Sequence, residues 1–195
     1  MKKAALIILI CILIQGCTSY NIQTNKSKKF PPKQEMKVAV LPFVPPSPQT
    51  VKKDLILGEQ TQYTLENAGV VVADSLASAL LEAPNIILIE RSQLEKILNE
   101  HKLSISGVIN NPDFALLGTI LPVDALVLGN VSTCYRYVDK IGVWGSVVSY
   151  TARLVNIHSG EVIFSINCTS YKVGILPEEL ALLLARDAIK KLLEK

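Results

Sequence analysis

Hydrophobic and polar positions along this chain change period several times, and the sharpest change lies within Ile86–Glu100. The apolar run Ile86–Ile89 is short and bounded by turn-forming residues, which predicts a buried strand rather than a helix. Apolar residues then recur at helical spacing, and Ser92 with Glu95 has the spacing of a capping box at a helix start. We therefore expect a strand that leads into a capped helix at the centre of a sheet.

Three further segments have helical periodicity. Ala68–Ala83 carries apolar and small residues on one face, which would permit close packing against a sheet. A shorter helix is expected from Pro112 to about Leu121, because proline suits the first helical position and Pro122 would end the helix. Pro177–Lys195 has apolar residues at amphipathic spacing and is predicted to be the last helix.

Four other segments have the composition or alternation of strands, namely Lys37–Phe43, Asp124–Thr133, Val143–Ile157 and Glu161–Val173. Asn156–Glu161 is expected to form a tight hairpin turn in which Gly160 supplies a positive φ. The predicted order is β-α-β-α-α-β-β-β-α. It indicates an α/β (α+β) fold, a single three-layer-like domain over residues 36–195 with a mixed sheet that is parallel early and antiparallel late.

The segment Val44–Asn67 is predicted to be a loop, because it holds three prolines followed by polar residues. A loop of this length within a compact domain is usually functional or disordered. We therefore expect it to contact a partner, with Leu57, Tyr63, Leu65 and Asn67 as the contact residues.

The N-terminus has the pattern of a secretory signal. Lys2 and Lys3 precede eleven apolar residues, too few to span a bilayer as a helix, and Gln15-Gly16-Cys17 follows them. This end resembles a bacterial lipobox, which implies that residues 1–16 are removed and that Cys17 is acylated, for example with palmitate. The alternative is an ordinary signal with an incidental cysteine. Since Thr18 replaces the aspartate that retains lipoproteins in the inner membrane, the resemblance implies the periplasmic face of the outer membrane.

Residues 17–35 are polar, rich in lysine and interrupted by Pro31-Pro32, so we expect a flexible, poorly ordered tether that carries the lipid. Loss of Lys2 and Lys3 with the signal lowers the formal charge from +3 to +1. A nearly neutral domain without a dense basic cluster argues against nucleic acid as a partner.

Of the four cysteines, Cys11 would leave with the signal and Cys17 would carry lipid. Cys134 and Cys168 remain, both on predicted strands, and an oxidising periplasm would permit a disulfide between them. The alternative is two small buried apolar side chains.

The sequence offers no recognisable catalytic, cofactor or metal site. It contains two histidines, His101 and His158, and neither lies in a metalloprotease, redox or hydrolase motif. Gly142 and Gly145 do not open a predicted helix, so they do not form a phosphate loop. We therefore expect a protein that is not an enzyme.

Several of these segments resemble the periplasmic domain of the CsgG family of curli secretion lipoproteins. The similarity lies in Ala39–Phe43, Ala73–Leu80, Ile89–Glu100, Asp124–Val131 and Ala152–Val162. It implies a lipid-anchored homo-oligomeric ring that acts in envelope assembly or secretion, and whose subunits each donate two hairpins to a transmembrane pore. A similar domain occurs in LpoB-like lipoproteins that activate peptidoglycan synthases, which is the alternative function.

The sequence departs from the CsgG pattern in the two hairpin segments. Only seventeen residues separate Thr133 from Thr151, and six separate Ser170 from Pro177. A membrane-spanning strand needs about 9 to 11 residues, so a hairpin needs about 20 more than the core strands. The second hairpin is therefore absent. The first is at most a stub whose aromatic residues touch the membrane interface, or else an exposed tip with aromatic cross-strand pairs; these residues are Tyr135, Tyr137, Trp144 and Tyr150.

Overall fold

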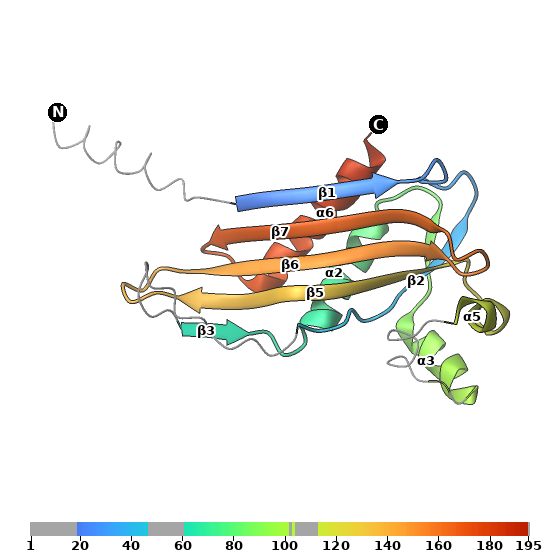
Figure 1. Cartoon of the computed structure of the whole chain (residues 1–195), viewed down its shortest axis with the longest axis horizontal. Helices are drawn as coiled ribbons and strands as arrows, with labels where there is room; N and C mark the ends of the chain where they lie inside the picture. The colour runs from blue at the N-terminus through green and yellow to red at the C-terminus, as the bar shows by residue number, and fades with distance from the viewer. Residues whose placement is uncertain (1–18, 47–60, 102, 104–112, 195) are drawn as a thin grey trace.

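A seven-stranded mixed sheet organises the chain in the computed structural model, which describes residues 19–46, 61–101, 103 and 113–194 (Figure 1). The strands are β1 (Ser19–Lys26), β2 (Met36–Val40), β3 (Thr61–Thr64), β4 (Ile86–Leu88), β5 (Ala125–Val138), β6 (Trp144–Asn156) and β7 (Val162–Val173). Six strands follow the order β1-β7-β6-β5-β2-β4, and β3 pairs with the far end of β5. Strand β2 pairs in parallel with β4 and β5, whereas the pairings among β5, β6, β7 and β1 are antiparallel.

Helices cover the sheet unequally. The described helices are α2 (Ala68–Leu80), α3 (Arg91–Glu100), α5 (Phe114–Ile120) and α6 (Pro177–Leu193). Helices α2 and α6 lie together behind one face of the long strands, while α3 and α5 lie at one end of the other face (Figure 1). Within the described part of the chain, no helix covers the other face of the strands β1, β7, β6 and β5 over most of its length.

Two apolar cores follow from the alternation of side chains along β2. Val38 and Val40 point into a large core with α2 and α6, whereas Ala39 and Leu41 point into a smaller core with α3 and α5. All four side chains are buried because helices cover both faces of β2. The predicted α/β (α+β) class with a mixed sheet is thus confirmed, and the three-layer arrangement applies to the β2 end.

The predicted unit at Ile86–Glu100 is present but differs from expectation in two ways. Strand β4 lies at the edge of the sheet rather than at its centre, and Ile87 is 36% exposed. The capping box is wrong, because helix α3 starts after Glu90 and no side chain caps it, which places Ser92 inside the first turn. Short strands at sheet edges carry less buried surface than central ones.

The predicted flexible tether is wrong for the described residues 19–35. Ser19–Lys26 forms strand β1, which pairs antiparallel with β7 along its whole length. Its side chains hold it against α6. Tyr20 donates to the carboxylate of Asp187, and Lys26 Nζ donates to the carbonyls of Leu192 and, at 2.9 Å, of Glu194.

Two other elements have different bounds from those expected. Strand β5 continues to Val138, beyond the expected end at Thr133, so residues 139–143 alone connect it to β6. The helix expected from Pro112 begins one residue after Asp113, whose side chain accepts a hydrogen bond from Leu116 N at 3.1 Å. Gly160 has a φ of 69°, which confirms the hairpin turn.

Candidate functional site

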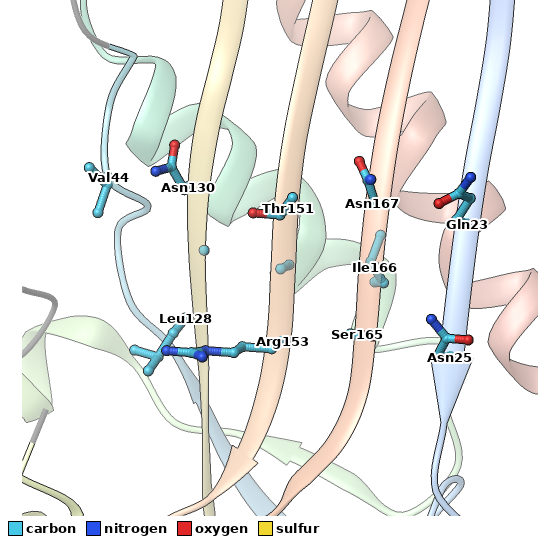
Figure 2. Close-up of a pocket in the computed structure, with 12 residues that line it drawn as sticks. Gln23, Asn25, Val44, Leu128, Asn130, Thr151, Arg153, Ser165, Ile166 and Asn167 are labelled. Atoms are coloured by element: carbon cyan, nitrogen blue, oxygen red, sulfur yellow. The ribbon is translucent and has the colours of Figure 1, made fainter.

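The open side of the sheet carries aligned polar side chains from four strands, which we name the polar face (Figure 2). The antiparallel registers bring these side chains into two rows across β5, β6, β7 and β1. The first row comprises Asn130, Thr151, Asn167 and Gln23, and the second comprises Leu128, Arg153, Ser165 and Asn25. The intervening residues point the other way into the core with α2 and α6, as Tyr150 and Cys168 do.

The polar face is uncharged apart from Arg153, whose side chain lies across β5 toward Leu128 (Figure 2). Amide and hydroxyl groups both donate and accept hydrogen bonds, so they can match many polar partners. One neighbouring pair already bonds, since the hydroxyls of Ser149 and Thr169 are 2.9 Å apart. Such a surface can be covered by another molecule without burying several unpaired charges.

A shallow hollow of about 500 Å³ lies on the polar face. Val44 forms one side of it, because the chain after β2 continues beside β5 and pairs with Asn130 as an isolated parallel bridge. Below it, Gly129 lies against the Phe43 ring, which leaves no room for a side chain at that position. The chain thus builds the hollow from a tightly packed floor and polar walls.

Exposed apolar side chains gather where the β5–β6 turn and the β7–α6 connection meet, at the left of Figure 1, a region we name the hairpin end. The two connections touch there, since Gly174 N donates to Trp144 O at 2.9 Å. The exposed side chains are Ile141 (85%), Val143 (40%), Trp144 (37%), Val173 (40%) and Leu176 (40%).

Aromatic rings flank the hairpin end on both faces of the sheet. On the helix side, the Arg136 guanidinium lies 5.3 Å from the Tyr63 ring centroid and 5.8 Å from that of Trp144. On the open side, the Tyr137 and Tyr171 rings stack at 5.3 Å with their hydroxyls 2.5 Å apart. Burial, followed by this hydrogen bond, raises the pKa of Tyr137 well above its ordinary value.

Sequence comparison identifies the family to which this scaffold belongs. The profile described as curli production assembly/transport component CsgG matches residues 17–174. The chain belongs to the CsgG family. No protein of curated function matches this CsgG family member in sequence.

Solved structures share the CsgG family member's fold at low sequence identity. The PelC dodecamer from Paraburkholderia phytofirmans is 13% identical, with a TM-score of 0.55 over 89% of this chain and 97% of that one. Lipoprotein GNA1162 from Neisseria meningitidis is 17% identical, with a TM-score of 0.58 over 82% of this chain and 99% of that one. At these identities the likeness shows the fold alone.

The structure places the predicted contact residues of this CsgG family member in different settings. Tyr63 is 54% exposed on β3 and pairs with Arg136, whereas Leu65 is partly buried against the core. Asn67 is exposed at the start of α2. Leu57 and the lipidation candidate Cys17 lie outside the described residues. Of the three predicted contact residues that the structure describes, Tyr63 alone joins the hairpin end.

The two candidate disulfide cysteines are both free and buried. Cys134 lies opposite Val148 on β6, and Cys168 lies opposite Tyr150 on the other side of the same strand, so β6 separates them. Cys134 and Cys168 therefore form no disulfide, and both are small buried side chains, as in the other alternative. Burial raises the pKa of the Cys134 thiol to about 12 and that of Cys168 to about 11.

Across the described residues of this CsgG family member, no group of three or more His, Cys, Asp and Glu side chains is arranged to hold a metal ion. No helix in the described part of the chain is both long enough and apolar enough to cross a membrane. The hairpin segments match the short lengths expected from the sequence, since residues 139–143 join β5 to β6 and residues 174–176 join β7 to α6.

The polar face was not predicted from the sequence. Its signal was present in the alternation of amides and hydroxyls with apolar residues along β6 and β7. Strand β1 showed no such alternation of polar and apolar residues, because Ile22 is its one buried apolar residue. The side chains that β1 adds to the polar face could therefore not be expected from the sequence.

Proposed function

We propose that the protein is a lipid-anchored lipoprotein on the periplasmic face of the outer membrane, which acts in envelope assembly or secretion through protein–protein contacts as a homo-oligomer. Membership of the CsgG family supports the assembly or secretion role. The lipobox-like sequence ending in Cys17 supports the anchor. The fold shared with a dodecameric PelC supports the oligomer.

The observation that carries this proposal is the polar face. A solvated face of an antiparallel sheet usually carries many charged side chains, whereas the two central rows here hold Arg153 as their one charged residue. The cores of protein–protein interfaces are depleted of charged residues in the same way. A neighbouring copy could cover Asn130, Thr151 and Asn167 and satisfy their amide and hydroxyl groups by hydrogen bonds.

The test is the mass of the lipidated protein in mild detergent, measured by native mass spectrometry. We expect a closed homo-oligomer for the wild type. Asn167→Lys places a charge in the centre of the polar face and should shift the mass toward the monomer. Asn99→Lys makes the same change on the exposed surface of α3 and should leave the oligomer intact.

Two outcomes would contradict parts of this proposal separately. A monodisperse wild-type monomer would remove the oligomer and favour the activator alternative. The anchor is tested by Cys17→Ser, which should release the protein from membranes into the soluble fraction. Retention of that variant in the membrane would show that the lipobox interpretation is wrong.

A further inference from the structure

Lysines concentrate in the connection between β1 and β2. Five of the chain's 20 lysines and arginines fall within residues 26–37, at the opposite end of the sheet from the hairpin end (Figure 1). The sequence predicted a flexible tether for most of this stretch, in which the charges would have no fixed position. Whether they form a binding surface depends on how firmly the connection is held.

The connection is packed against the domain. The Phe30 ring is buried and meets Phe164 edge to face, with the ring centroids 5.0 Å apart. Asn85 Nδ2 donates a hydrogen bond to Pro32 O at 2.9 Å, which ties the connection to the start of β4. The lysines beside these contacts are therefore held in place by the fold.

Three lysines of the connection surround an open hollow of about 620 Å³, which we name the lysine hollow; they are Lys28, Lys29 and Lys33. Lys29 forms an ion pair with Glu161. Lys28 and Lys33 are exposed, and neither forms an ion pair with a described residue. The hollow thus presents two ammonium groups that no described acid neutralises, and such groups attract anions.

The lysine hollow is also lined by acidic and amide groups, namely Glu35, Asp124 and Asn156. The Asp124 carboxylate accepts a hydrogen bond from Lys37 N at 2.7 Å, so the backbone of β2 holds it in position. Glu35 is exposed and forms no ion pair within the described part of the chain. A ligand that matches this lining carries both anionic and cationic groups.

The two signs of charge narrow the choice of partner. A nucleic acid carries negative charge alone along its backbone, so the carboxylates of the hollow would repel it. The peptide stems of peptidoglycan carry free carboxylates together with the ammonium group of a diamino acid. They are also exposed in the periplasm, where we have proposed that the protein lies.

We propose that the lysine hollow binds the peptide stems of peptidoglycan, with stem carboxylates on Lys28 and Lys33 and the stem ammonium group on Glu35. This inference rests on the periplasmic location in the proposed function. Lysine binds a carboxylate by charge-assisted hydrogen bonds. Each such contact is weak at an exposed site, but the copies of an oligomer would hold several stems of one polymer at once.

Sedimentation with purified peptidoglycan sacculi tests the proposal. The lipidated protein is kept in mild detergent, so binding does not depend on a membrane. We expect it to sediment with the sacculi, and Lys28→Glu/Lys33→Glu should weaken binding on the order of tenfold. Lys96→Glu/Lys140→Glu makes the same change of net charge at exposed positions outside the hollow and should leave binding unchanged. Equal losses in the two double variants, or a wild type that stays in solution, would overturn the proposal.

Chemically altered sacculi identify the part of the polymer that binds. Amidation of the stem carboxylates should abolish binding, and removal of the stems by an amidase should do the same. Binding to the peptide-free glycan strands would overturn the proposal. Polyglutamate carries carboxylates without ammonium groups and should compete weakly. Full competition at equal carboxylate concentration would overturn the peptidoglycan assignment in favour of an acidic protein segment.

Acetylation of the free stem ammonium groups tests the role of Glu35. Acetylated sacculi should bind the wild type more weakly than untreated sacculi do, whereas Glu35→Gln should bind both kinds equally. An equal loss on acetylation in both proteins would contradict the placement of the ammonium group on Glu35.

The same samples separate this inference from the proposed function. By native mass spectrometry, a monomer that binds sacculi contradicts the oligomer alone, whereas an oligomer that does not bind them contradicts the lysine hollow alone. The periplasmic location is tested by osmotic shock, which should release the Cys17→Ser protein with the periplasmic fraction. Retention of that variant inside the cells would contradict the location, whatever the result with sacculi.

Discussion

The Nζ atom of Lys191 donates a hydrogen bond to the main-chain carbonyl of Ile22 at 2.7 Å, across 169 positions of sequence. This contact joins the last turn of α6 to the first strand. Lys26 makes the converse contact, because its ammonium group satisfies carbonyls at the C-terminal end of α6. Strand β1 and helix α6 therefore hold one another, and β1 is part of the domain rather than a tether.

Replacement of this lysine should loosen β1 selectively. We expect Lys191→Met to lower the free energy of unfolding by about 1 kcal/mol, because the methionine keeps the apolar stem and loses the hydrogen bond. Amide hydrogens of β1 should exchange faster than those of β6. Lys190→Met, at an exposed neighbouring position, is the control. Equal exchange rates in the two variants would show that Lys191 does not hold the strand.

A second prediction concerns the floor of the hollow. A Cβ at Gly129 would lie 2.5 Å from two carbons of the Phe43 ring, which is itself buried. We expect Gly129→Ala to lower the free energy of unfolding by about 1–3 kcal/mol through overpacking, measured by urea denaturation. In combination with Phe43→Leu the loss should be smaller than the sum of the single losses. Strict additivity would mean that the contact does not cause the loss.

The sequence predicted those helices and strands whose local periodicity is clear without knowing which distant segments pack against them. Helices α2 and α6 are periodic over many residues, and β6 and β7 alternate clearly, so all four were found. Strand β1 was missed because Ile22 is the one side chain that it places in the core. The asparagine and glutamine residues around Ile22 give the strand the composition of a solvated linker. Its order depends on β7 and α6, which lie far away in the sequence.

The candidate site was less predictable than the fold. The rows of the polar face arise from the register among four strands, and β1 joins them from the opposite end of the chain. The aromatic stub at the hairpin end was anticipated only in part. Tyr137 is buried by its stack on Tyr171, Tyr150 lies in the core and Tyr135 is half-buried. Trp144 is therefore the one exposed aromatic residue of the four, and it lies near Ile141, which the sequence did not single out.

A third prediction contrasts the cap expected at Ser92 with the cap observed at Asp113. Ser92→Ala should leave the free energy of unfolding nearly unchanged, because Ser92 lies inside α3 and makes no capping hydrogen bond. Asp113→Ala should cost about 1 kcal/mol, because Asp113 Oδ1 accepts from Leu116 N at the start of α5. Urea denaturation of both variants at neutral pH provides the comparison. If Ser92→Ala lowered the free energy of unfolding more than Asp113→Ala does, Ser92 would act as a helix cap after all.

The last prediction follows from the buried thiols. Burial is the main cause that raises the pKa of Cys134 to about 12 and of Cys168 to about 11, whereas an unfolded thiol titrates near about 8.5. Above a pH of about 8.5 the thiols lose their protons in the unfolded state but keep them in the native state. Each thiol should therefore reduce the free energy of unfolding by up to about 1.4 kcal/mol per pH unit between these pKa values. At neutral pH both states are protonated, so neither thiol affects the pH dependence there.

The double variant Cys134→Ala/Cys168→Ala isolates this effect. It should be less stable than the wild type at pH 7, because each small side chain leaves a gap in the core. Its free energy of unfolding should nevertheless fall less steeply as the pH rises above about 8.5, since the alanines carry no proton. Urea denaturation followed by Trp144 fluorescence at a series of pH values measures both slopes. Burial and, after it, Cys168 raise the pKa of Tyr150, so the two proteins are compared below about pH 9.5, where tyrosines of ordinary pKa about 10 are still mostly protonated in the unfolded state. Parallel curves in that range would mean that the native thiols titrate as unfolded ones do.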